Sequence, residues 1–438
     1  MKKTNNLLKK VATQNNLRLS WDSIKHRDKS KGIDNQTIED FENDLKNQLN
    51  FIRKDLLNNK YKFLALRGYP LKKGSKTRAI KIPAVRDRVV QKAIELVIFD
   101  YIKVRYNIDN PVSFAYIKKK RVKDAVDRIV LYKKHGYEWV YNADIRKFFD
   151  TIDVSNLLNN YVFPCLPDKS INKLIEGALI NEIGNKNDLI LIGEYDNFVT
   201  KEGGIPQGGI LSPLFANIYL YPLDEIMIKH NYKMVRYADD FIIMCKTKEE
   251  AVKMHKVAKE IIENKLRLKL HPLSISKPKD NNKYCTIERS DFEFLGIKFR
   301  GSKIYPVPNA FKKIIKDIKI VNRNGLFKTL NYLKTRVDNW GATYYYTNYE
   351  KSHYSVLDDS LQSVIKKVLK KYGLKPTNGD VTKDTLVKIG MPTFTESLTN
   401  YKNINKKGET KKDPRDNALK SKSIRIASSY IRSTRNGC

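Results

Sequence analysis

Cysteine pairs are missing from this chain. Its four cysteines lie far apart and form no Cys-x-x-Cys sequence, at Cys165, Cys245, Cys285 and Cys438. This spacing excludes a disulfide framework and a cysteine-rich zinc site, and it is typical of ordinary thiols in a reducing compartment. The six histidines are scattered and form no His-Glu-x-x-His sequence, so we expect structural roles for them. These absences predict a cytoplasmic protein.

Long apolar runs are missing as well. No segment reaches 18 consecutive apolar residues, so we expect no membrane-spanning helix. The N-terminus begins with Met1, Lys2 and Lys3 but lacks the apolar stretch of a signal peptide. The 41% hydrophobic and 10% aromatic residues still supply large cores. Because 438 residues exceed what one core organises, we expect several domains.

Acidic residues are scarce relative to basic ones. The chain has 48 Asp and Glu against 84 Lys and Arg, which gives a net charge of +36. A folded protein with this excess is expected to bind a polyanion, and nucleic acid is a better candidate than an anionic membrane.

The acidic residues that are present include an adjacent pair, Asp239 and Asp240, in the sequence Tyr-Ala-Asp-Asp between two short apolar runs. Two carboxylates at a tight turn repel each other, and folding gains nothing evident from them. Divalent cations would offset this cost, and Mg²⁺ prefers carboxylate and phosphate oxygens. Asp144 ends another apolar run, so a sheet with both segments side by side would gather three carboxylates. Two metal ions held there could catalyse phosphoryl transfer, as in the palm of a nucleic-acid polymerase.

Helical and extended patterns alternate along the chain. We expect helices in residues 1–60, 87–104, 118–131, 170–183, 212–228, 248–266 and 310–372. We expect hairpins or strands at 62–83, 137–144, 189–192, around Asp239, and at 292–299. The stretch 376–438 is polar, basic and weakly patterned, which predicts a flexible tail or one ordered by RNA.

Two further segments carry candidate binding residues. Lys72, Lys76 and Arg78 flank a Gly-Ser turn, where a basic hairpin would hold a triphosphate. The glycine-rich turn at residues 203–209 permits close approach of backbone to a nucleotide or template base, and Gln207 would offer an amide there.

The motifs together resemble a bacterial reverse transcriptase of the group II intron-like lineage. The matching segments are residues 80–91, 142–150 (NADIRKFFD), 204–220 (GIPQGGILSPLFANIYL), 236–241 (RYADDF), 294–296, and 340–345 with 357–358. The resemblance covers about residues 55 to 372.

This resemblance implies an α+β, right-hand fold of fingers, palm and thumb, with an antiparallel palm sheet and a helical thumb. We expect an N-terminal helical extension at 1–60, fingers at 61–135, palm with finger elements at 136–305, thumb at 306–372 and a basic region at 373–438. It also implies RNA-templated DNA synthesis from dNTPs with two Mg²⁺ ions, for which Mn²⁺ could substitute.

The resemblance also assigns roles to residues. Asp144, Asp239 and Asp240 are the expected catalytic residues, with metal bound by Asp144, Asp239 and the backbone carbonyl of Ile145. Phe149 would block a ribose 2′-hydroxyl and so select dNTPs. The expected nucleotide-binding set is Lys72, Lys76, Arg78, Phe149 and Gln207, and the expected nucleic-acid contacts are Gly208, Tyr237, Lys118, Lys119 and Lys120.

Departures from the family pattern shape the biological hypotheses. Ser274 stands where the family carries a lysine, and Lys277 comes three residues late, so a lysine general acid is not expected. We find no intron DNA-binding domain, HNH endonuclease or Val-Thr-Gly sequence, a pattern typical of defence-associated reverse transcriptases that copy a dedicated noncoding RNA. Two alternatives stay open: an intron maturase without an endonuclease domain, and a basic RNA-binding scaffold. The template, product, oligomeric state and primer (RNA, DNA or a protein tyrosine) also stay open.

Overall fold

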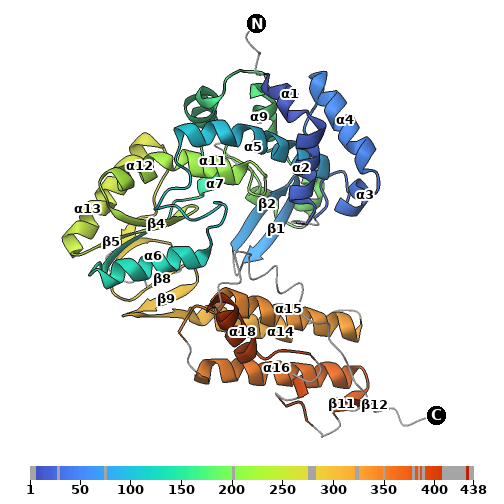
Figure 1. The fold of residues 1–438 in the computed structure, drawn as a ribbon, viewed down its shortest axis with the longest axis vertical. Coiled ribbons are helices and arrows are strands. Elements are labelled where there is room, and N and C mark those ends of the chain that lie inside the picture. The colour runs from blue at the N-terminus through green and yellow to red at the C-terminus, as the bar shows by residue number, and fades with distance from the viewer. Residues whose placement is uncertain are drawn as a thin grey trace. The chain divides into compact units, whose positions relative to one another are not determined.

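The chain folds into two compact units, Met1–Glu288 and Arg289–Cys438, in the computed structural model (Figure 1). The structure describes residues 6–26, 30–73, 76–199, 203–274, 283–320, 325–348, 351–376, 380–382, 385–386, 390–406 and 431–433. Within these residues, no helix combines the length and the apolar character needed to cross a membrane.

Four helices at the N-terminus pack around one long helix. They are α1 (Leu7–Val11), α2 (Gln14–Ile24), α3 (Ile38–Asn43) and α4 (Leu45–Leu57), and they contact α5 (Val85–Arg105) (Figure 1). Trp21 stacks on Phe41 at a centroid distance of 4.9 Å, and both side chains are fully buried. Thr13 and Thr37 cap α2 and α3 by accepting backbone N–H groups. This helical segment therefore shares a core with α5.

The first unit also contains a two-stranded hairpin and a mixed sheet. β1 (Arg67–Lys73) pairs antiparallel with β2 (Lys76–Ile82). The five-stranded sheet has the order β4-β5-β3-β7-β6, with β3 at Trp139–Ala143, β4 at Lys233–Tyr237, β5 at Asp240–Cys245, β6 at Leu273–Ser274 and β7 at Cys285–Arg289. The β3–β5 and β4–β5 pairs are antiparallel, as expected, whereas β6 and β7 are parallel. Helix α13 (Lys248–Lys259) packs on β3 and β5.

Shorter helices complete this unit. They are α6 (Val122–Lys134), α7 (Phe148–Thr151), α8 (Val154–Asn156), α9 (Asn172–Ala178), α10 (Lys186–Leu191), α11 (Ser212–Tyr219) and α12 (Tyr221–Lys229). Turns of π-helix cover Leu157–Val162 and Glu260–Lys265, and 3₁₀ turns cover Phe163–Cys165 and Tyr195–Asn197.

Two of the predicted elements are wrong. The strand expected at residues 189–192 lies mostly in helix α10, where Leu189 is buried while Leu191 is 85% exposed. A short apolar run does not distinguish a strand from a helix by itself. The single helix expected at 212–228 is split at Leu220, because Pro222 lacks a backbone N–H and disfavours helical backbone before it.

The second unit contains a three-stranded sheet and a helical core. The sheet order is β10-β9-β8, with β8 at Phe292–Phe294, β9 at Ile297–Arg300 and β10 at Lys303–Pro306. The helices are α14 (Pro308–Lys319), α15 (Leu326–Tyr344), α16 (Lys351–Lys371) and α18 (Phe394–Lys406), and β11 (Leu374–Pro376) pairs with β12 (Ile431–Ser433). The unit boundary thus groups residues 292–306 with the helices, although we expected residues up to 305 to belong to the palm.

Helix α18 corrects the expectation that everything after residue 376 is weakly patterned. The fully buried Asp358 caps this helix, because its carboxylate accepts the backbone N–H of Phe394 at 2.7 Å and the hydroxyl of Thr395 at 2.7 Å. Gly341 leaves room for close packing, since a Cβ there would lie 2.2 Å from the Ser397 hydroxyl oxygen. The sequence signals at residues 340–345 and 357–358 therefore include residues that dock this last helix.

A buried ion pair joins β4 to α12 in the first unit. The side chain of Arg236 is fully buried and binds Asp224 through two hydrogen bonds, at 2.7 and 2.5 Å. Asn110 donates to the same carboxylate at 2.9 Å, and Asn217 accepts from Arg236 at 3.1 Å. Arg236 also donates to the carbonyl of Ala238 at 3.0 Å, so this network reaches the turn between β4 and β5.

Replacing Asp224 with alanine should lower the free energy of unfolding by about 3–5 kcal/mol, because Arg236 would stay buried without its counter-charge. The matched control is Asp22→Ala, which removes an exposed carboxylate that pairs with Arg18 at 3.3 Å and Lys25 at 3.1 Å. That surface change should cost about 0–1 kcal/mol. Urea unfolding followed by circular dichroism measures both; equal midpoints for the two variants would contradict the structural role of the pair.

Candidate active site

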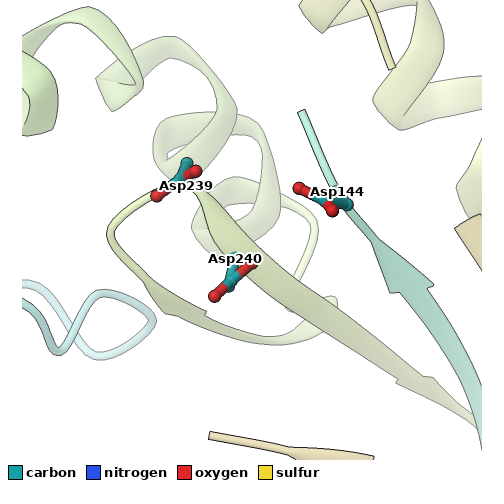
Figure 2. A group of neighbouring side chains, drawn as sticks. All are labelled: Asp144, Asp239 and Asp240. Atoms are coloured by element: carbon teal, nitrogen blue, oxygen red, sulfur yellow. The ribbon is translucent and has the colours of Figure 1, made fainter. Parts of the chain in front are cut away.

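Three carboxylates meet at one end of the five-stranded sheet. Asp144 directly follows β3, Asp239 lies in the turn between β4 and β5, and Asp240 is the first residue of β5 (Figure 2). Strands β3 and β5 are neighbours, with Ala143 opposite Phe241. One carboxylate oxygen from each of the three residues lies within 4.8 Å of the other two. The juxtaposition expected from the sequence is confirmed, because the antiparallel register brings the strand end and the turn together.

The pKa values in this cluster reflect desolvation first and the crowding of like charges second. Desolvation, with the negative charge of Asp144 as a further cause, raises the pKa of Asp239. Asp240 is exposed on its outer side, but desolvation by the surrounding protein, then the charges of Asp239 and Asp144, raise its pKa to about 6. The arrangement disfavours three negative charges on their own and suits divalent cations with oxygen ligands. The residues present therefore fit Mg²⁺ or Mn²⁺.

The turn that presents the two aspartates is held in an uncommon backbone conformation. Ala238 has φ of +60°, in the left-handed region that costs a residue with a Cβ roughly 1–3 kcal/mol. The buried Arg236 donates to the Ala238 carbonyl, and its own backbone N–H donates to Val112 at 2.8 Å. Surrounding structure thus fixes a turn that the local sequence would not favour alone.

Asp144 is held from its other side by the segment that precedes β6. The backbone N–H of His271 donates to the Asp144 carbonyl at 3.0 Å, and the buried thiol of Cys285 lies 3.9 Å from the same oxygen. Lys283 forms an ion pair with the carboxylate, with Nζ 2.5 Å from Oδ2. Its charge lowers the pKa values of Asp239 and Asp240, opposing the desolvation that raises them. The carboxylate is therefore anchored through both its backbone and its side chain.

Lys283 is a residue that sequence reasoning missed. The family pattern drew attention to Ser274, which lies on β6, and to Lys277, which lies outside the described residues. No periodicity or motif marks Lys283, and only the pairing of strands brings it to Asp144.

The glycine-rich turn approaches its neighbours closely. The backbone N–H of Lys81 on β2 donates to the carbonyl of Gln207 at 2.7 Å. Gly208 has φ of +124°, and a Cβ there would lie 2.5 Å from the Lys81 carbonyl oxygen. A Cβ at Gly204 would lie 2.5 Å from the carbonyl oxygen of Phe149. The glycines therefore let one loop contact both the hairpin and α7 through backbone atoms.

A buried lysine supports the same loop. Lys81 is 1% exposed, and its ammonium donates to the Asn181 side chain at 3.0 Å. Asn181 in turn donates to the Gly204 carbonyl at 2.8 Å. Burial lowers the pKa of Lys81, and the negative charge of Asp150, next to Phe149, opposes that shift. Hairpin, glycine loop and α7 are thereby linked into one scaffold.

The three basic residues of the expected nucleotide-binding set have different surroundings. Arg78 is exposed on β2, and its charge lowers the pKa values of Asp239 and Asp240, which places it near the carboxylates. Lys72 on β1 instead forms an ion pair with Glu194 at 3.5 Å. The side chain of Lys76 lies outside the described residues, although its backbone begins β2.

Phe149 lies on α7, which the glycine loop contacts, and Gln207 lies in the loop itself. Phe149 is partly buried on α7 and packs edge-on against Phe148 at 5.3 Å. Gln207 is partly buried, with its carbonyl bound to Lys81. The structure therefore positions both residues through main-chain contacts.

Tyr116 is a second residue near the carboxylates that sequence reasoning did not assign to the site. Its side chain is 53% exposed and its φ is +60°. Desolvation, then the charges of Asp239 and Tyr237, raise its pKa, while Arg78 lowers it. The loose family match at residues 110–116 was the signal that could have indicated it.

The expected nucleic-acid contacts differ in their surroundings. Lys118 and Lys119 are exposed. Lys120 donates to the carbonyls of Asn110 and Ser113, at 2.5 and 3.0 Å, so its ammonium is engaged within the protein. Tyr237 ends β4 opposite Asp240 and is partly buried.

The chain is similar to several known proteins. It is 25% identical to protein YkfC of Escherichia coli (strain K12) over 51% of this chain and 66% of that protein. It is 28% identical to the group II intron-encoded protein LtrA of Lactococcus lactis subsp. cremoris over 40% of this chain and 27% of LtrA. The chain thus spans less than two thirds of the length of these relatives.

Solved structures also match. A partial Cas6-RT-Cas1–Cas2 complex matches with a TM-score of 0.37 and 23% identity, over 59% of this chain and 43% of that chain. Apo telomerase from Candida tropicalis matches with a TM-score of 0.39 and 13% identity, over 78% of this chain and 61% of that chain.

The family assignment follows from the match that covers most of the site. The family model described as "Reverse transcriptase (RNA-dependent DNA polymerase)" matches residues 70–299, more than half of the chain. This span includes most of the hairpin, all three carboxylates and the glycine loop. The expected right-hand polymerase fold is confirmed, and the chain belongs to the reverse transcriptase family.

Proposed function

We propose that this protein is an RNA-directed DNA polymerase. The observation that carries the proposal is the group of Asp144, Asp239 and Asp240, with one oxygen of each within 4.8 Å of the others. Membership of the reverse transcriptase family supports the reaction class. The net charge of +36 supports nucleic-acid partners, which would be an RNA template and the DNA product. A basic scaffold without catalysis would leave the carboxylate cluster unexplained.

The reaction is attack of a primer 3′-hydroxyl on the α-phosphorus of a dNTP. A bond forms from that oxygen to phosphorus, the hydroxyl proton is released to water, and pyrophosphate leaves with the electron pair of the broken phosphorus–oxygen bond. Two Mg²⁺ ions, when bound, lower the hydroxyl pKa and neutralise the developing charge. Asp144 and Asp239, with the carbonyl of Ile145, would hold these ions, and Asp240 would assist through its charge. Arg78 would bind the triphosphate, with Lys76 and Lys72 as further contacts.

Phe149 and Gln207 would recognise the nucleotide and its pairing partner. The ring of Phe149 would occupy the space that a ribose 2′-hydroxyl needs, and the amide of Gln207 would contact the base pair or template sugar. Gly208 and Tyr237 would lie against the nucleic acid, and Lys118 and Lys119 would contact its phosphates. The role first expected for Lys120 is less well supported, because its ammonium binds two backbone carbonyls.

We further propose that the template is a dedicated structured noncoding RNA and that the protein acts in the cytoplasm in defence against phage. The excess of basic residues, with a net charge of +36, supports a structured RNA as partner. The alternative is a group II intron maturase, and the similarity to LtrA favours it. The domain assignment into fingers, palm and thumb remains part of the same proposal.

One experiment separates the two roles. RNA and DNA that co-purify with the wild type and with the Asp239→Ala, Asp240→Ala double variant are sequenced separately. One enriched noncoding RNA, with complementary DNA only in the wild type, would support the defence polymerase. Intron RNA from both proteins without complementary DNA would support the maturase.

Asp239→Asn should lower DNA synthesis on an RNA template by about 10³-fold or more, because several kcal/mol of metal-borne transition-state stabilisation would be lost. The matched control is Asp100→Asn, since Asp100 is 73% exposed and pairs only with Lys103 among the ion pairs of the described residues. Primer extension with Mg²⁺ and dNTPs measures both variants. Comparable activity of Asp239→Asn and the control would refute the proposed catalytic site.

Phe149→Ala should increase NTP incorporation relative to dNTP incorporation by about 10- to 100-fold, because a steric contact against the 2′-hydroxyl would be lost. The measurement is kcat/KM for dGTP and GTP on one primer–template. Phe148→Leu is the control, since Phe148 is a buried neighbour whose loss should lower stability without altering the ratio.

Mn²⁺ should bind the carboxylate cluster about tenfold more weakly at pH 5 than at pH 7. The pKa of Asp240 is raised to about 6, so protons compete with the metal as the pH falls through that value. Titration calorimetry without nucleotide measures this affinity. Asp240→Asn should weaken binding and flatten the pH dependence, and equal affinity of the wild type at both pH values would contradict the expectation.

A further inference from the structure

Two cations lie directly opposite each other beside Asp144. Ile145 and Leu270 form an antiparallel bridge, and both side chains are buried. Because side chains alternate across extended backbone, Arg146 and Lys269 lie on the other face, with Asp144. The backbone N–H of Arg146 donates to the Lys269 carbonyl at 2.8 Å, so these two residues are cross-strand neighbours.

This placement of two cations destabilises the folded protein when no anion is bound between them. Like charges directly opposite each other on neighbouring strands destabilise a sheet. Both side chains are exposed, and neither forms an ion pair within the part of the chain that the structure describes. An anion between the two cations would convert the repulsion into two charge-assisted contacts.

A cavity of about 360 Å³ opens at this position. Its lining is Arg146, Glu263, Arg267, Leu268, Lys269 and Leu270. Three cations thus face one carboxylate. Glu263 is already engaged, because it accepts the backbone N–H of Leu270 at 3.3 Å and lies 3.8 Å from Lys259.

Arg267 connects this cavity to a second one of about 280 Å³. Its φ of +56° places it in the left-handed region, and its guanidinium lies 3.9 Å from Asp153 at the second cavity. The second cavity is lined by two cations, Lys265 and Arg267, and one carboxylate, Asp153. The first has three cations and one carboxylate, so its positive excess is larger.

We propose that the first cavity is an anion site for the pyrophosphate released by the polymerase reaction. The inference rests on the proposed function. Arg146 is two residues from Asp144 on the same face, which corresponds to about 7 Å along extended backbone. A polyanionic product leaving the carboxylates proposed to bind metal would reach Arg146 and Lys269 directly. The same phosphate chemistry could come from the backbone of bound nucleic acid, and the experiment below distinguishes the two.

The test measures binding, so it does not depend on polymerase activity. Inorganic pyrophosphate is titrated calorimetrically into the full chain in EDTA, without nucleic acid. The double variant Arg146→Gln, Lys269→Gln should bind about 10- to 100-fold more weakly, because charge-assisted hydrogen bonds are lost. The control Arg53→Gln, Lys54→Gln makes the same changes at exposed positions of α4 and should bind like the wild type.

Two further measurements distinguish a site from a passive charged surface. The swap Arg146→Lys, Lys269→Arg should retain most of the affinity, because both cations remain. Without phosphate in the buffer, Arg146→Gln alone should raise the melting temperature, because the cross-strand repulsion is removed.

Equal pyrophosphate affinity in the glutamine double variant and its control would overturn the proposal. Loss of affinity for a short single-stranded RNA, with pyrophosphate binding intact, would also overturn it and identify the site as a nucleic-acid backbone contact. A third outcome separates the two proposals. If the wild type does not polymerise DNA, but pyrophosphate binding is lost only in the glutamine double variant, the proposed function is refuted and the anion site is still supported.

Discussion

The buried guanidinium of Arg236 is the interaction on which the active-site geometry depends. It neutralises Asp224 on α12 and donates hydrogen bonds to the side-chain oxygen of Asn217 and to the Ala238 carbonyl of the strained turn. Two adjacent aspartates repel each other, and a residue with a Cβ resists left-handed backbone. A rigid, fully satisfied polar network beneath the turn offsets both costs. Stability elsewhere in the unit therefore allows the destabilising cluster to persist.

The same principle governs the glycine loop. Its contacts with β2 and α7 run through backbone atoms at Gln207, Gly208 and Gly204, and a side chain at either glycine would collide with its neighbours. Beneath it, the buried Lys81 is hydrogen-bonded to the partly buried Asn181. Residues proposed to recognise the nucleotide are thus positioned by groups that would never touch it. Placing them on fixed backbone favours selectivity, since a mobile loop would adapt to either sugar.

In the second unit, the same residues that resemble the family's thumb also dock a further helix, α18. The segments at 340–345 and 357–358 resemble the family's thumb, and their Gly341 and Asp358 dock and cap α18. Helix α18 itself carries little signal in the sequence, because its charged and polar residues obscure the apolar positions that pack against α15 and α16. Its helical form is stabilised mainly by tertiary packing, as is usual for short helices.

The sequence by itself determined the family, the three clustered carboxylates and most elements, because these depend on local patterns: adjacent aspartates, apolar periodicity, and glycines at a turn. Only the tertiary structure decided that Lys283 reaches Asp144, that Tyr116 lies near the aspartates, and that Lys120 is engaged internally. It also decided that Arg146 faces Lys269 across a bridge. These relations join residues distant in the chain, and strand register, which no local pattern specifies, sets which of them meet.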